Sequence, residues 1–309
     1  MSAIVVRELQ RSYGDIRAVK GISFEVDHGE VFALVGPSGA GKTTTVEILG
    51  GNRERCGGEV SVLGFDPATG GRAYRERIGV VLQEAGLDEE STVRELLRLH
   101  AGFYADPRPI DEVLELVGLV ERCDARVTAL SRDKRRRVDL ALGLVGDPEV
   151  LFLDDPTIGF DPAARWQAWK VMNKLCATGK TIVLTTQSLE EARELSADRV
   201  GVIASGRLVA VGSPAELATS HRNGSLGTIR FRLPDGIGAG NLPDLGGQLL
   251  ICPSGGIELR TPWPTRTWQV LTTWAQHYRV ELEGLTLVPP SFEDIYFELI
   301  GRVAAPSTG

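Results

Sequence analysis

Residues 31–43 read VFALVGPSGAGKT, an apolar segment that enters a glycine-rich turn and ends on Lys42 and Thr43. Residues 36–43 fit the pattern G-x-x-x-x-G-K-S/T completely, with a strand expected before the turn and a helix after it. Glycines let backbone N–H groups surround phosphate oxygens, and the N-terminus of the following helix favours the anion. Lys42 can reach the β- and γ-phosphates, and the Thr43 hydroxyl can ligate Mg²⁺. The predicted phosphate-binding loop comprises Gly36, Pro37, Ser38, Gly39, Ala40, Gly41, Lys42, Thr43 and Thr44.

A second pattern, at residues 151–155 (LFLDD), is an apolar strand that ends in two carboxylates. A strand end here would deliver Asp154 to the coordination shell of a phosphate-bound Mg²⁺. Taken alone, the pentapeptide also fits a polar exit from a strand, and residues 36–43 also fit a glycine turn with a solvated lysine. The two patterns occur in one chain, which favours a Mg²⁺–nucleotide site over both alternatives.

Strand-like and helix-like segments alternate through the first two-thirds of the chain. Buried-strand candidates are residues 30–35, 78–82, 150–153 and 181–185, and residues 200–211 read as a hairpin. Runs that are apolar on both faces and separated by helices indicate a mostly parallel sheet. The expected fold class is therefore α/β.

Helix boundaries carry their own signals. Thr92 and Glu95 have the spacing of a capping box, and Asp161 before Pro162 reads as an N-cap followed by the first turn. Gly179 reads as the end of the helix that Asp161 begins.

The chain divides by character into two domains. Residues from about 84 to 146 are helical in pattern and rich in charge, which predicts a helical subdomain inserted in the sheet domain. Near residue 219 the sequence becomes rich in glycine, proline and short strand-like pieces. We therefore expect a main domain at residues 1–218 and a smaller C-terminal domain at residues 219–309, with a helix at 266–277.

Composition excludes several classes of protein. Hydrophobic residues make up 42% and charged residues 24%, which are ordinary globular values and exclude dominant disorder. The net charge of −7 disfavours a nucleic-acid partner, and the five basic residues within 132–137 read as a solvated helix start. We find no apolar run near the roughly 20 residues of a membrane span and no signal-peptide pattern, so any membrane role is expected to be peripheral.

The order and spacing of these motifs resemble the nucleotide-binding subunit of ABC transporters across most of residues 4–215. The resemblance implies a P-loop NTPase fold with an N-terminal antiparallel β subdomain, and it implies ATP and Mg²⁺ as cofactors. It also implies roles for single residues. These are Tyr13 as the aromatic side chain that stacks on adenine, Gln83 as a sensor of Mg²⁺, Leu130 and Ser131 as the opening of the signature segment, Asp154 as the magnesium ligand, and Asp161 in the loop that crosses a dimer interface.

Three departures from the family pattern fall at positions that serve hydrolysis. The signature Leu-Ser-Gly-Gly-Gln continues here with Arg132, Asp133 and Lys134, whose side chains obstruct close backbone approach to an opposing ATP. Asp155 replaces the glutamate that orients the attacking water and is one methylene shorter, and loss of a well-placed base typically costs roughly 10²–10⁴-fold. Gln187 replaces the switch histidine; it can donate a hydrogen bond but cannot carry a proton. We expect Mg-ATP binding with slow turnover, although these substitutions could also be tolerated by an enzyme that is merely slower.

A finer resemblance is to the drug-resistance branch of type 2 exporters, whose ATPase subunits carry a small C-terminal domain. Residues 290–296 (PSFEDIY) resemble that branch's C-terminal motif. The expected function is an ATPase subunit at the cytoplasmic face of the membrane, dimerised with a second ATP-binding subunit and attached to an integral-membrane transporter subunit. The second ATP-binding subunit could be another copy of this chain or a homologue.

Two other functions remain open at this level. One is an ATP-binding regulatory or scaffolding subunit that has largely lost hydrolysis, which the substitutions at Asp155 and Gln187 favour. The other is a non-transport ABC protein, which the single cassette and the absence of a basic arm in the sequence disfavour.

Overall fold

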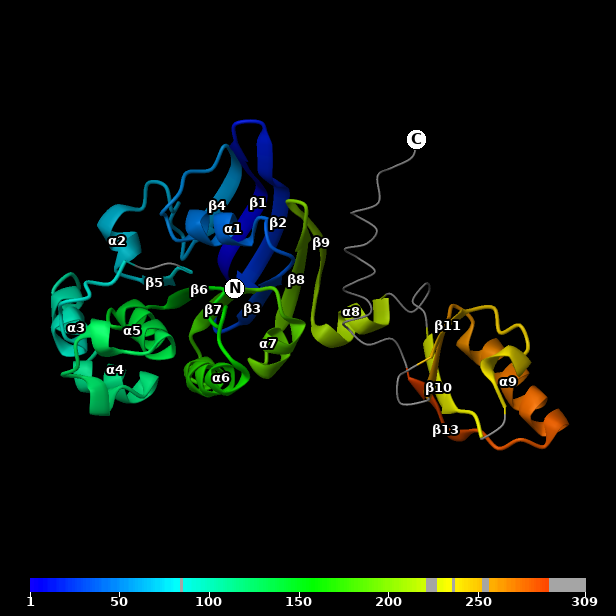
Figure 1. The fold of residues 1–309 in the computed structure, drawn as a ribbon. Coiled ribbons are helices and arrows are strands. Elements are labelled where there is room, and N and C mark those ends of the chain that lie inside the picture. Colours follow the sequence, from blue (N-terminus) through cyan, green and yellow to red (C-terminus); the bar gives the residue numbers. More distant parts are fainter. Residues whose placement is uncertain (84–85, 221–226, 235–236, 252–255, 289–309) are drawn as a thin grey trace. The chain divides into compact units, whose positions relative to one another are not determined.

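The computed structural model forms two compact units, Met1–Pro214 and Ala215–Gly309 (Figure 1). The structure describes the chain except for residues 84–85, 221–226, 235–236, 252–255 and 289–309.

A six-stranded sheet is the centre of the first unit and has the order β5-β6-β7-β3-β8-β9. Its strands are β3 (Val31–Val35), β5 (Ile78–Val81), β6 (Val150–Asp154), β7 (Thr181–Thr186), β8 (Arg199–Ala204) and β9 (Arg207–Gly212). All neighbouring strands are parallel except β8 and β9, which form an antiparallel hairpin. The predicted mostly parallel sheet and the predicted hairpin are confirmed.

The strand order explains why distant motifs meet. Strands β6, β7 and β3 are adjacent and parallel, and every residue in each of them is buried. Their carboxyl ends therefore lie along one edge of the sheet, where ligands of α/β folds bind. The segments that begin at Gly36, Asp155 and Gln187 leave the sheet at this edge.

A second sheet packs against the first and confirms the expected N-terminal antiparallel subdomain. It has the order β2-β1-β4, with β1 (Ser2–Tyr13), β2 (Ile16–Asp27) and β4 (Gly57–Val62). Phe24 of β2 stacks on Phe32 of β3 with 5.2 Å between ring centroids. The two sheets therefore share one hydrophobic core.

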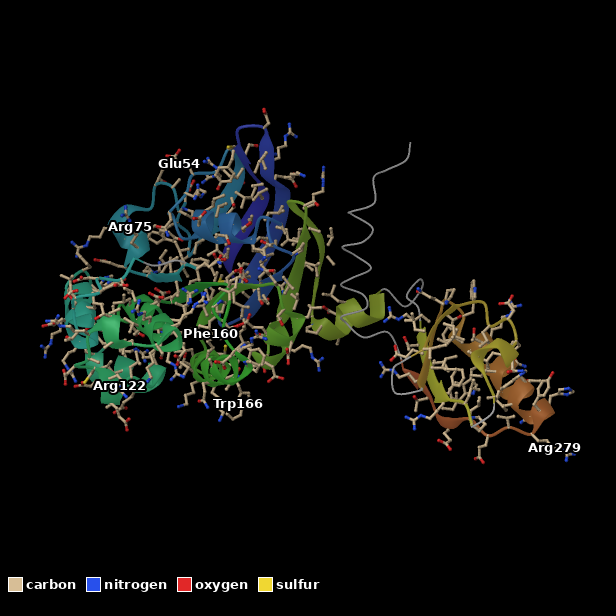
Figure 2. The ribbon with its side chains drawn as sticks, viewed as in Figure 1. Glu54, Arg75, Arg122, Phe160, Trp166 and Arg279 are labelled. Carbon is tan, nitrogen blue, oxygen red and sulfur yellow. The ribbon has the colours of Figure 1, made fainter. Side chains whose placement is uncertain are left out.

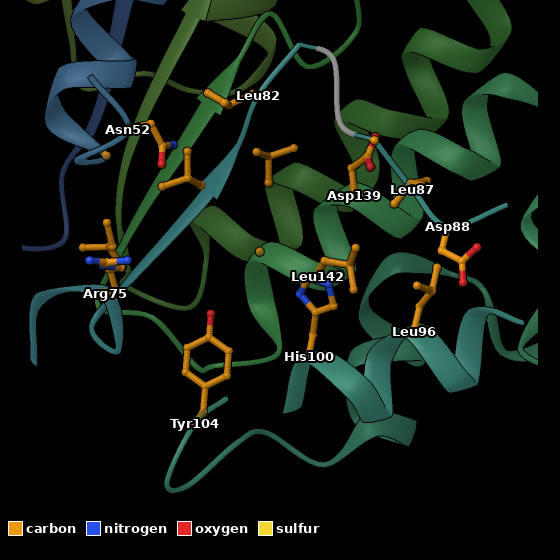
Figure 3. A pocket seen from close by; sticks show the side chains of 16 residues that line it. Asn52, Arg75, Leu82, Leu87, Asp88, Leu96, His100, Tyr104, Asp139 and Leu142 are labelled. Carbon is orange, nitrogen blue, oxygen red and sulfur yellow. The ribbon is translucent and has the colours of Figure 1, made fainter. Parts of the chain in front are cut away.

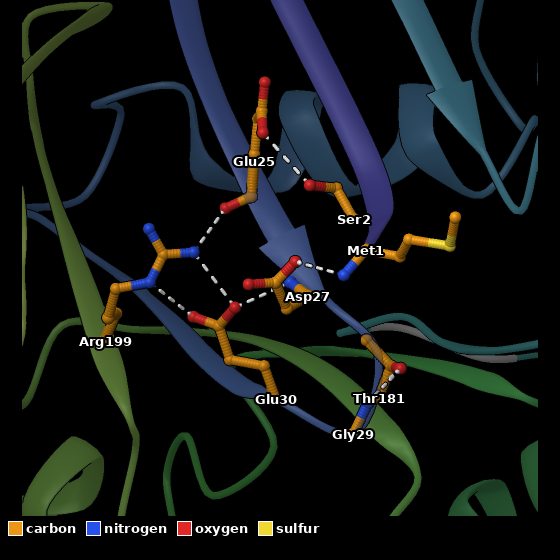
Figure 4. Close-up of polar contacts among 8 residues, drawn as sticks. All are labelled: Met1, Ser2, Glu25, Asp27, Gly29, Glu30, Thr181 and Arg199. Atoms are coloured by element: carbon orange, nitrogen blue, oxygen red, sulfur yellow. Dashed lines mark hydrogen bonds and ion pairs between the residues drawn. The ribbon is translucent and has the colours of Figure 1, made fainter.

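Polar contacts fix the edge of this packing (Figure 4). Arg199 Nε donates to the buried Glu30 at 2.8 Å, and Arg199 Nη2 donates to the Glu25 carbonyl at 2.7 Å. The Gly29 amide donates to Thr181 Oγ1 at 2.9 Å. These contacts join β2 of one sheet to the starts of β7 and β8 in the other.

Helices surround the central sheet. They are α1 (Lys42–Leu49), α2 (Gly71–Arg75), α3 (Val93–Ala101), α4 (Ile110–Val117), the 3₁₀ turns η1 (Val120–Arg122) and η2 (Val127–Ala129), α5 (Arg132–Leu144), α6 (Pro162–Cys176) and α7 (Leu189–Glu194). Helix α8 (Pro214–Ser220) begins at the last residue of the first unit. Between β5 and β6 lie α3, α4 and α5, which agrees with the expected helical insertion. Figure 2 shows Trp166 at the surface of α6, where half of it is exposed and Lys170 Nζ lies 3.3 Å from the ring centroid.

Two helix starts are as predicted and one helix end is not. Both hydrogen bonds of the capping box between Thr92 and Glu95 are present at α3. Asp161 caps α6, and its Oδ1 accepts from the Ala164 amide at 2.8 Å. Helix α6 ends at Cys176, three residues before Gly179; its C-cap residue Ala177 still has helical backbone angles, and Gly179 follows with φ +73°.

The second unit is a small α+β domain, as expected. Its antiparallel sheet has the order β11-β12-β10-β13, with β10 (Gly227–Arg232), β11 (Gln248–Ile251), β12 (Gly256–Thr261) and β13 (Glu283–Val288). It also holds η3 (Ala239–Asn241) and α9 (Pro264–Tyr278), which covers the expected helix at 266–277. Leu271 and Trp274 of α9 join Phe231 and Leu259 of the strands in one core. The motif at residues 290–296 lies outside the described residues.

Candidate functional site

The loop after β3 has the geometry of a phosphate cradle. A Cβ on Gly36 would lie 2.2 Å from the Ile203 carbonyl oxygen, so only glycine lets the chain pass β8 at this point. Gly41 has φ +105°, and a Cβ there would lie 2.5 Å from the Ala18 carbonyl oxygen. Helix α1 begins at the next residue, Lys42, so its free N–H groups face the loop.

Lys42 is buried inside this loop with only 4% of its surface exposed. Its Nζ donates to the Gly36 carbonyl at 3.0 Å and to the Pro37 carbonyl at 3.1 Å. Burial lowers the pKa of Lys42 from its ordinary value, and the nearby carboxylates of Asp155 and Asp154 oppose that shift. The ammonium is therefore held where a phosphate could replace weak carbonyl contacts with charged ones.

A cavity of about 270 Å³ opens above the loop. It brings together residues from four separate motifs. Its lining is Ala18, Ser38, Gly39, Gly41, Lys42, Thr43, Thr44, Gln83, Asp155, Ile158 and Gln187. The expected positions of the phosphate loop, Gln83, Asp155 and Gln187 thus converge on one space.

The residues next to this cavity fit a magnesium ion. Thr43 Oγ1 donates to Asp154 Oδ1 at 3.1 Å, and Thr185 Oγ1 donates to the same oxygen at 2.5 Å. The other oxygen, Asp154 Oδ2, is buried and has no hydrogen-bond partner among the described residues. A buried carboxylate oxygen without a partner is costly, and Mg²⁺ prefers oxygen ligands of this kind. Thr43 and Asp154 are therefore the pair that would hold it.

Asp155 follows directly and adopts a strained backbone conformation with φ +42°. Its amide donates to Thr185 Oγ1 at 2.9 Å, and 7% of its surface is exposed. Burial raises the pKa of Asp155, and Asp154 and Glu191 add to that rise, while Lys42 and a hydrogen bond from Gln187 oppose it. Asp155 and Gln187 both line the cavity above the phosphate loop.

Tyr13 lies on the outer side of the loop and is partly exposed. Its hydroxyl and Thr44 Oγ1 are 3.5 Å apart. The guanidinium carbons of Arg11 and Arg53 lie 4.9 Å and 5.1 Å from its ring centroid. The ring thus makes cation–π contacts with two arginines, and a stacked base could take the place of one of them.

Ser131, Arg132, Asp133 and Asp161 are absent from the lining of this cavity. Ser131 is the N-cap residue of α5, and its hydroxyl donates to the Asp133 carboxylate. Arg132 Nη1 is 3.5 Å from the Gly159 carbonyl, and the Asp161 side chain caps α6. Arg132 thus contacts the loop before α6, whereas Ser131, Asp133 and Asp161 bond within their own segments.

Two polar residues of the site were not identified from the sequence. Thr185 contacts both Asp154 and Asp155, and its position two residues before Gln187 at a strand end was the available signal. Arg136 was counted in a basic run that we interpreted as solvated, but its side chain is only 12% exposed. That interpretation is wrong for Arg136, because its guanidinium bonds to backbone carbonyls inside the protein.

Both parts of the chain match family models of ABC transporter proteins. Residues 19–158 match the family model described as ABC transporter, and residues 227–291 match one described as ABC transporter domain-containing protein-like, C-terminal domain. The chain is 38% identical to the Nod factor export ATP-binding protein I of Rhizobium sp. (strain N33), over 97% of each chain. It is 36% identical to the protein of that name from Rhizobium meliloti (strain 1021), over 97% of this chain and 88% of the relative.

Solved structures give the same fold. An ATP-binding subunit of an ABC transporter superimposes with a TM-score of 0.63 at 28% identity, covering 71% of this chain and 93% of that one. A dimeric bacterial ABC transporter cassette superimposes with a TM-score of 0.61 at 24% identity, covering 68% and 98%. ATP and Mg²⁺ are the cofactors that the cassettes of this family bind, and the loop at residues 36–43 has the matching geometry. The chain belongs to the family of ABC transporter ATP-binding proteins.

Proposed function

We propose that this chain is the ATP-binding subunit of an ABC exporter and that it couples nucleotide binding to movement in a separate membrane subunit. The observation that carries the proposal is the convergence of Lys42, Thr43, Gln83 and Gln187 on one cavity beside Asp154. The curated relatives that match nearly the whole chain are named as export ATP-binding proteins, which supports the direction of transport.

Each residue has a role in this proposal. When bound, Mg²⁺ would neutralise negative charge on the phosphates. Lys42 would bind phosphate oxygens, Thr43 and Asp154 would hold the metal, and Gln83 would act as its sensor. The remaining loop residues contribute backbone N–H groups, and Tyr13 offers its ring to the base.

We propose that hydrolysis by this subunit is slow. Asp155 would orient the attacking water, but its side chain is one methylene shorter than the glutamate of the family pattern. Gln187 cannot relay a proton as an imidazole does. Both features leave binding intact while weakening proton removal from water.

The second half of each ATP site would come from another ATP-binding subunit. Ser131, Arg132 and Asp133 lie outside the cavity of their own chain, which supports their facing ATP on a partner. Arg132 and Lys134 would offset the negative charge that Asp133 brings near phosphate. Asp161 would cross the same interface, while its side chain continues to cap α6.

We propose a peripheral location on the cytoplasmic face of the membrane, next to an integral-membrane transporter subunit. Among the described residues, no helix is long and apolar enough to cross a bilayer. We also propose that the chain belongs to the drug-resistance branch of exporters, with residues 1–218 as the nucleotide-binding domain, its helical subdomain at about 84–146, and 219–309 as an accessory domain. The match of residues 227–291 to a C-terminal domain model supports the accessory domain.

The test is calorimetry and steady-state phosphate release with the purified chain. We expect Mg-ATP binding that Lys42→Ala abolishes, and turnover below about one per second, the low end of ordinary enzymes. We also expect Mg-ATP to shift the chain to a dimer in size exclusion, because slow hydrolysis delays reopening. No uptake of nucleotide with Mg²⁺ would refute the function, and turnover of several per second that Lys42→Ala abolishes would refute the slow site.

A regulatory or scaffolding subunit is the second candidate, and the presence of Asp155 and Gln187 in the cavity lining, in place of the family's glutamate and histidine, favours it. The two candidates differ in the assembled complex. If Lys42→Ala in this chain stops transport-coupled hydrolysis, the subunit drives the exporter. If hydrolysis by the complex persists, the subunit regulates it.

A further inference from the structure

Arg136 lies on α5, the helix that begins in the signature segment, where it meets the ends of strands β5 and β6. Its Nη2 donates to the Asp154 carbonyl at 2.8 Å, and its Nη1 donates to the carbonyl of Leu82. Weaker contacts reach the carbonyls of Gln83 and Pro156, each at 3.4 Å. One guanidinium therefore contacts the segment after β5 and the segment after β6 together.

The geometry suits an arginine fork. Strands β5 and β6 are parallel neighbours whose ladder pairs Val81 with Leu153, and the next residues are Leu82 and Asp154. Two N–H groups of one planar guanidinium bridge these two strand ends where the ladder stops. A lysine ammonium lacks this planar pair of donors.

The pair of Arg136 and Asp139 anchors the fork to α5. Their side chains are 12% and 10% exposed, and the ion pair measures 3.6 Å. Figure 3 shows Asp139 of α5 and Leu82, the residue after β5, in the lining of one cavity. The position of the Arg136 fork is thus set by helix packing and by a buried counter-charge.

The carbonyl that Arg136 holds belongs to the residue whose side chain is placed to bind Mg²⁺. One carboxylate oxygen of Asp154 accepts from Thr43 and Thr185, and the other has no hydrogen-bond partner within the described part of the chain. A shift of its backbone would move both oxygens relative to Thr43. The same shift would move Asp155, whose backbone has φ +42° and whose amide bonds to Thr185.

We propose that Arg136 is a positioning residue that holds the Asp154–Pro156 turn and the backbone of Gln83 in the arrangement that binds Mg²⁺. This rests on the proposed role of Asp154 as the metal ligand. Arg136 touches no nucleotide in this scheme and acts through the two strand ends. It makes the metal site depend on where the signature helix lies.

The first experiment measures ATP binding to the full chain by calorimetry, with EDTA and then with MgCl₂. The ratio of the two dissociation constants is the gain due to Mg²⁺. In Arg136→Gln we expect this gain to fall about tenfold, which is the size of one charge-assisted hydrogen bond. ATP affinity in EDTA should stay within about twofold, because the phosphate loop does not contact Arg136.

Arg135→Gln is the matched control. Arg135 stands beside Arg136 on α5, but it bonds to Glu89 and to the carbonyls of Leu130 and Thr128, away from the metal site. We expect its Mg²⁺ gain to equal that of the wild type. Arg136→Lys keeps the charge opposite Asp139 and loses the fork, so we expect a partial loss.

A second readout needs no nucleotide. Amide hydrogen exchange of the peptide spanning residues 154–158 should speed up in Arg136→Gln and Arg136→Lys, and stay unchanged in Arg135→Gln. If Arg136→Gln does not fold, Arg136→Lys decides the question.

Two results would overturn the inference. One is a folded Arg136 variant with the wild-type Mg²⁺ gain and wild-type exchange; the other is an equal loss of affinity in EDTA and in MgCl₂, which indicates general damage. Failure of the wild-type chain to bind ATP would instead refute the proposed function, and the exchange comparison would still judge Arg136.

Discussion

Asp155 shows how one methylene changes the chemistry of a site. Asp155 is buried and lines the same cavity as Lys42 and Gln187. A longer side chain at this position would reach further into the space above the phosphate loop. Loss of a well-placed base accounts for roughly 10²–10⁴-fold in rate, so recovery of part of that factor is expected.

Asp155→Glu should therefore raise the rate of phosphate release at saturating Mg-ATP about tenfold, because Gln187 and the altered signature still limit the site. Asp155→Asn is the control and should be no faster than the wild type. A Glu variant that binds Mg-ATP normally but releases phosphate no faster would show that the base is not the limiting defect.

Asp139 provides a prediction about pH. Burial raises the pKa of Asp139 to about 6, against an ordinary value of 3.8, and Arg136 opposes that rise. The folded state thus holds the proton more tightly than the unfolded chain. The contribution of protonated Asp139 to the stability of the folded chain is therefore complete below about pH 4, and it is lost as the pH rises through about 6. Other titratable groups around the neighbouring cavity are Arg75, Asp88, His100 and Tyr104 (Figure 3).

Asp139→Asn removes this titration and leaves the other groups in place. The difference in free energy of unfolding between Asp139→Asn and the wild type should shift in favour of the variant by about 1–3 kcal/mol from pH 4.5 to pH 7.5. Urea unfolding at both pH values measures it. A difference that is independent of pH would mean that Asp139 titrates normally in the folded chain.

At the scale of elements, Asp161 at the start of α6 has two roles: it caps the helix, and we propose that it lies at the dimer interface. Asp161→Ala removes the acceptor for the Ala164 amide, so we expect a loss of about 1 kcal/mol in the nucleotide-free chain. Asp161→Asn keeps a capping oxygen and should restore most of this stability.

The same two variants separate the cap from an interface role. Thermal unfolding reports the cap, and size exclusion with Mg-ATP reports the dimer. If Asp161→Asn restores stability and the dimer still fails to form, the charge acts at the interface. If both measurements recover together, the residue is only a cap.

Elements with strong local signals could be predicted from the sequence. The buried strands, the hairpin and the cap at Asp161 follow from short apolar runs and cap residues, which act within a few positions. The end of α6 was missed by three residues, because a glycine after a helix does not itself fix where the last hydrogen bond forms. Arg136 could not be predicted, because its burial depends on two strand ends that only the tertiary fold places beside α5.

The candidate site divides in the same way. Lys42, Thr43 and Asp154 were predictable, because their motifs carry the strand–turn–helix context with them. The contacts of Thr185 with both Asp154 and Asp155 were not, because they depend on how the ends of β6 and β7 pair in the tertiary fold.

At the scale of the whole molecule, the division into two units predicts independence of nucleotide binding. The cavity lining falls entirely within Met1–Pro214. A chain truncated after residue 218 should bind Mg-ATP within about twofold of the full chain, since ligand contacts are unchanged. Calorimetry on both forms checks this. A large loss of affinity in a truncated chain that remains folded would show that the C-terminal domain contributes to the site.

The ring of Tyr13, contacted by Arg11 and Arg53, has a consequence for selectivity among purines. Stacking on an aromatic ring stabilises any base, because it uses the face of the base and not the polar groups on its edge. GTP should then bind with nearly the same affinity as ATP. The nucleotide bound in the cell would then depend on the concentration of each triphosphate.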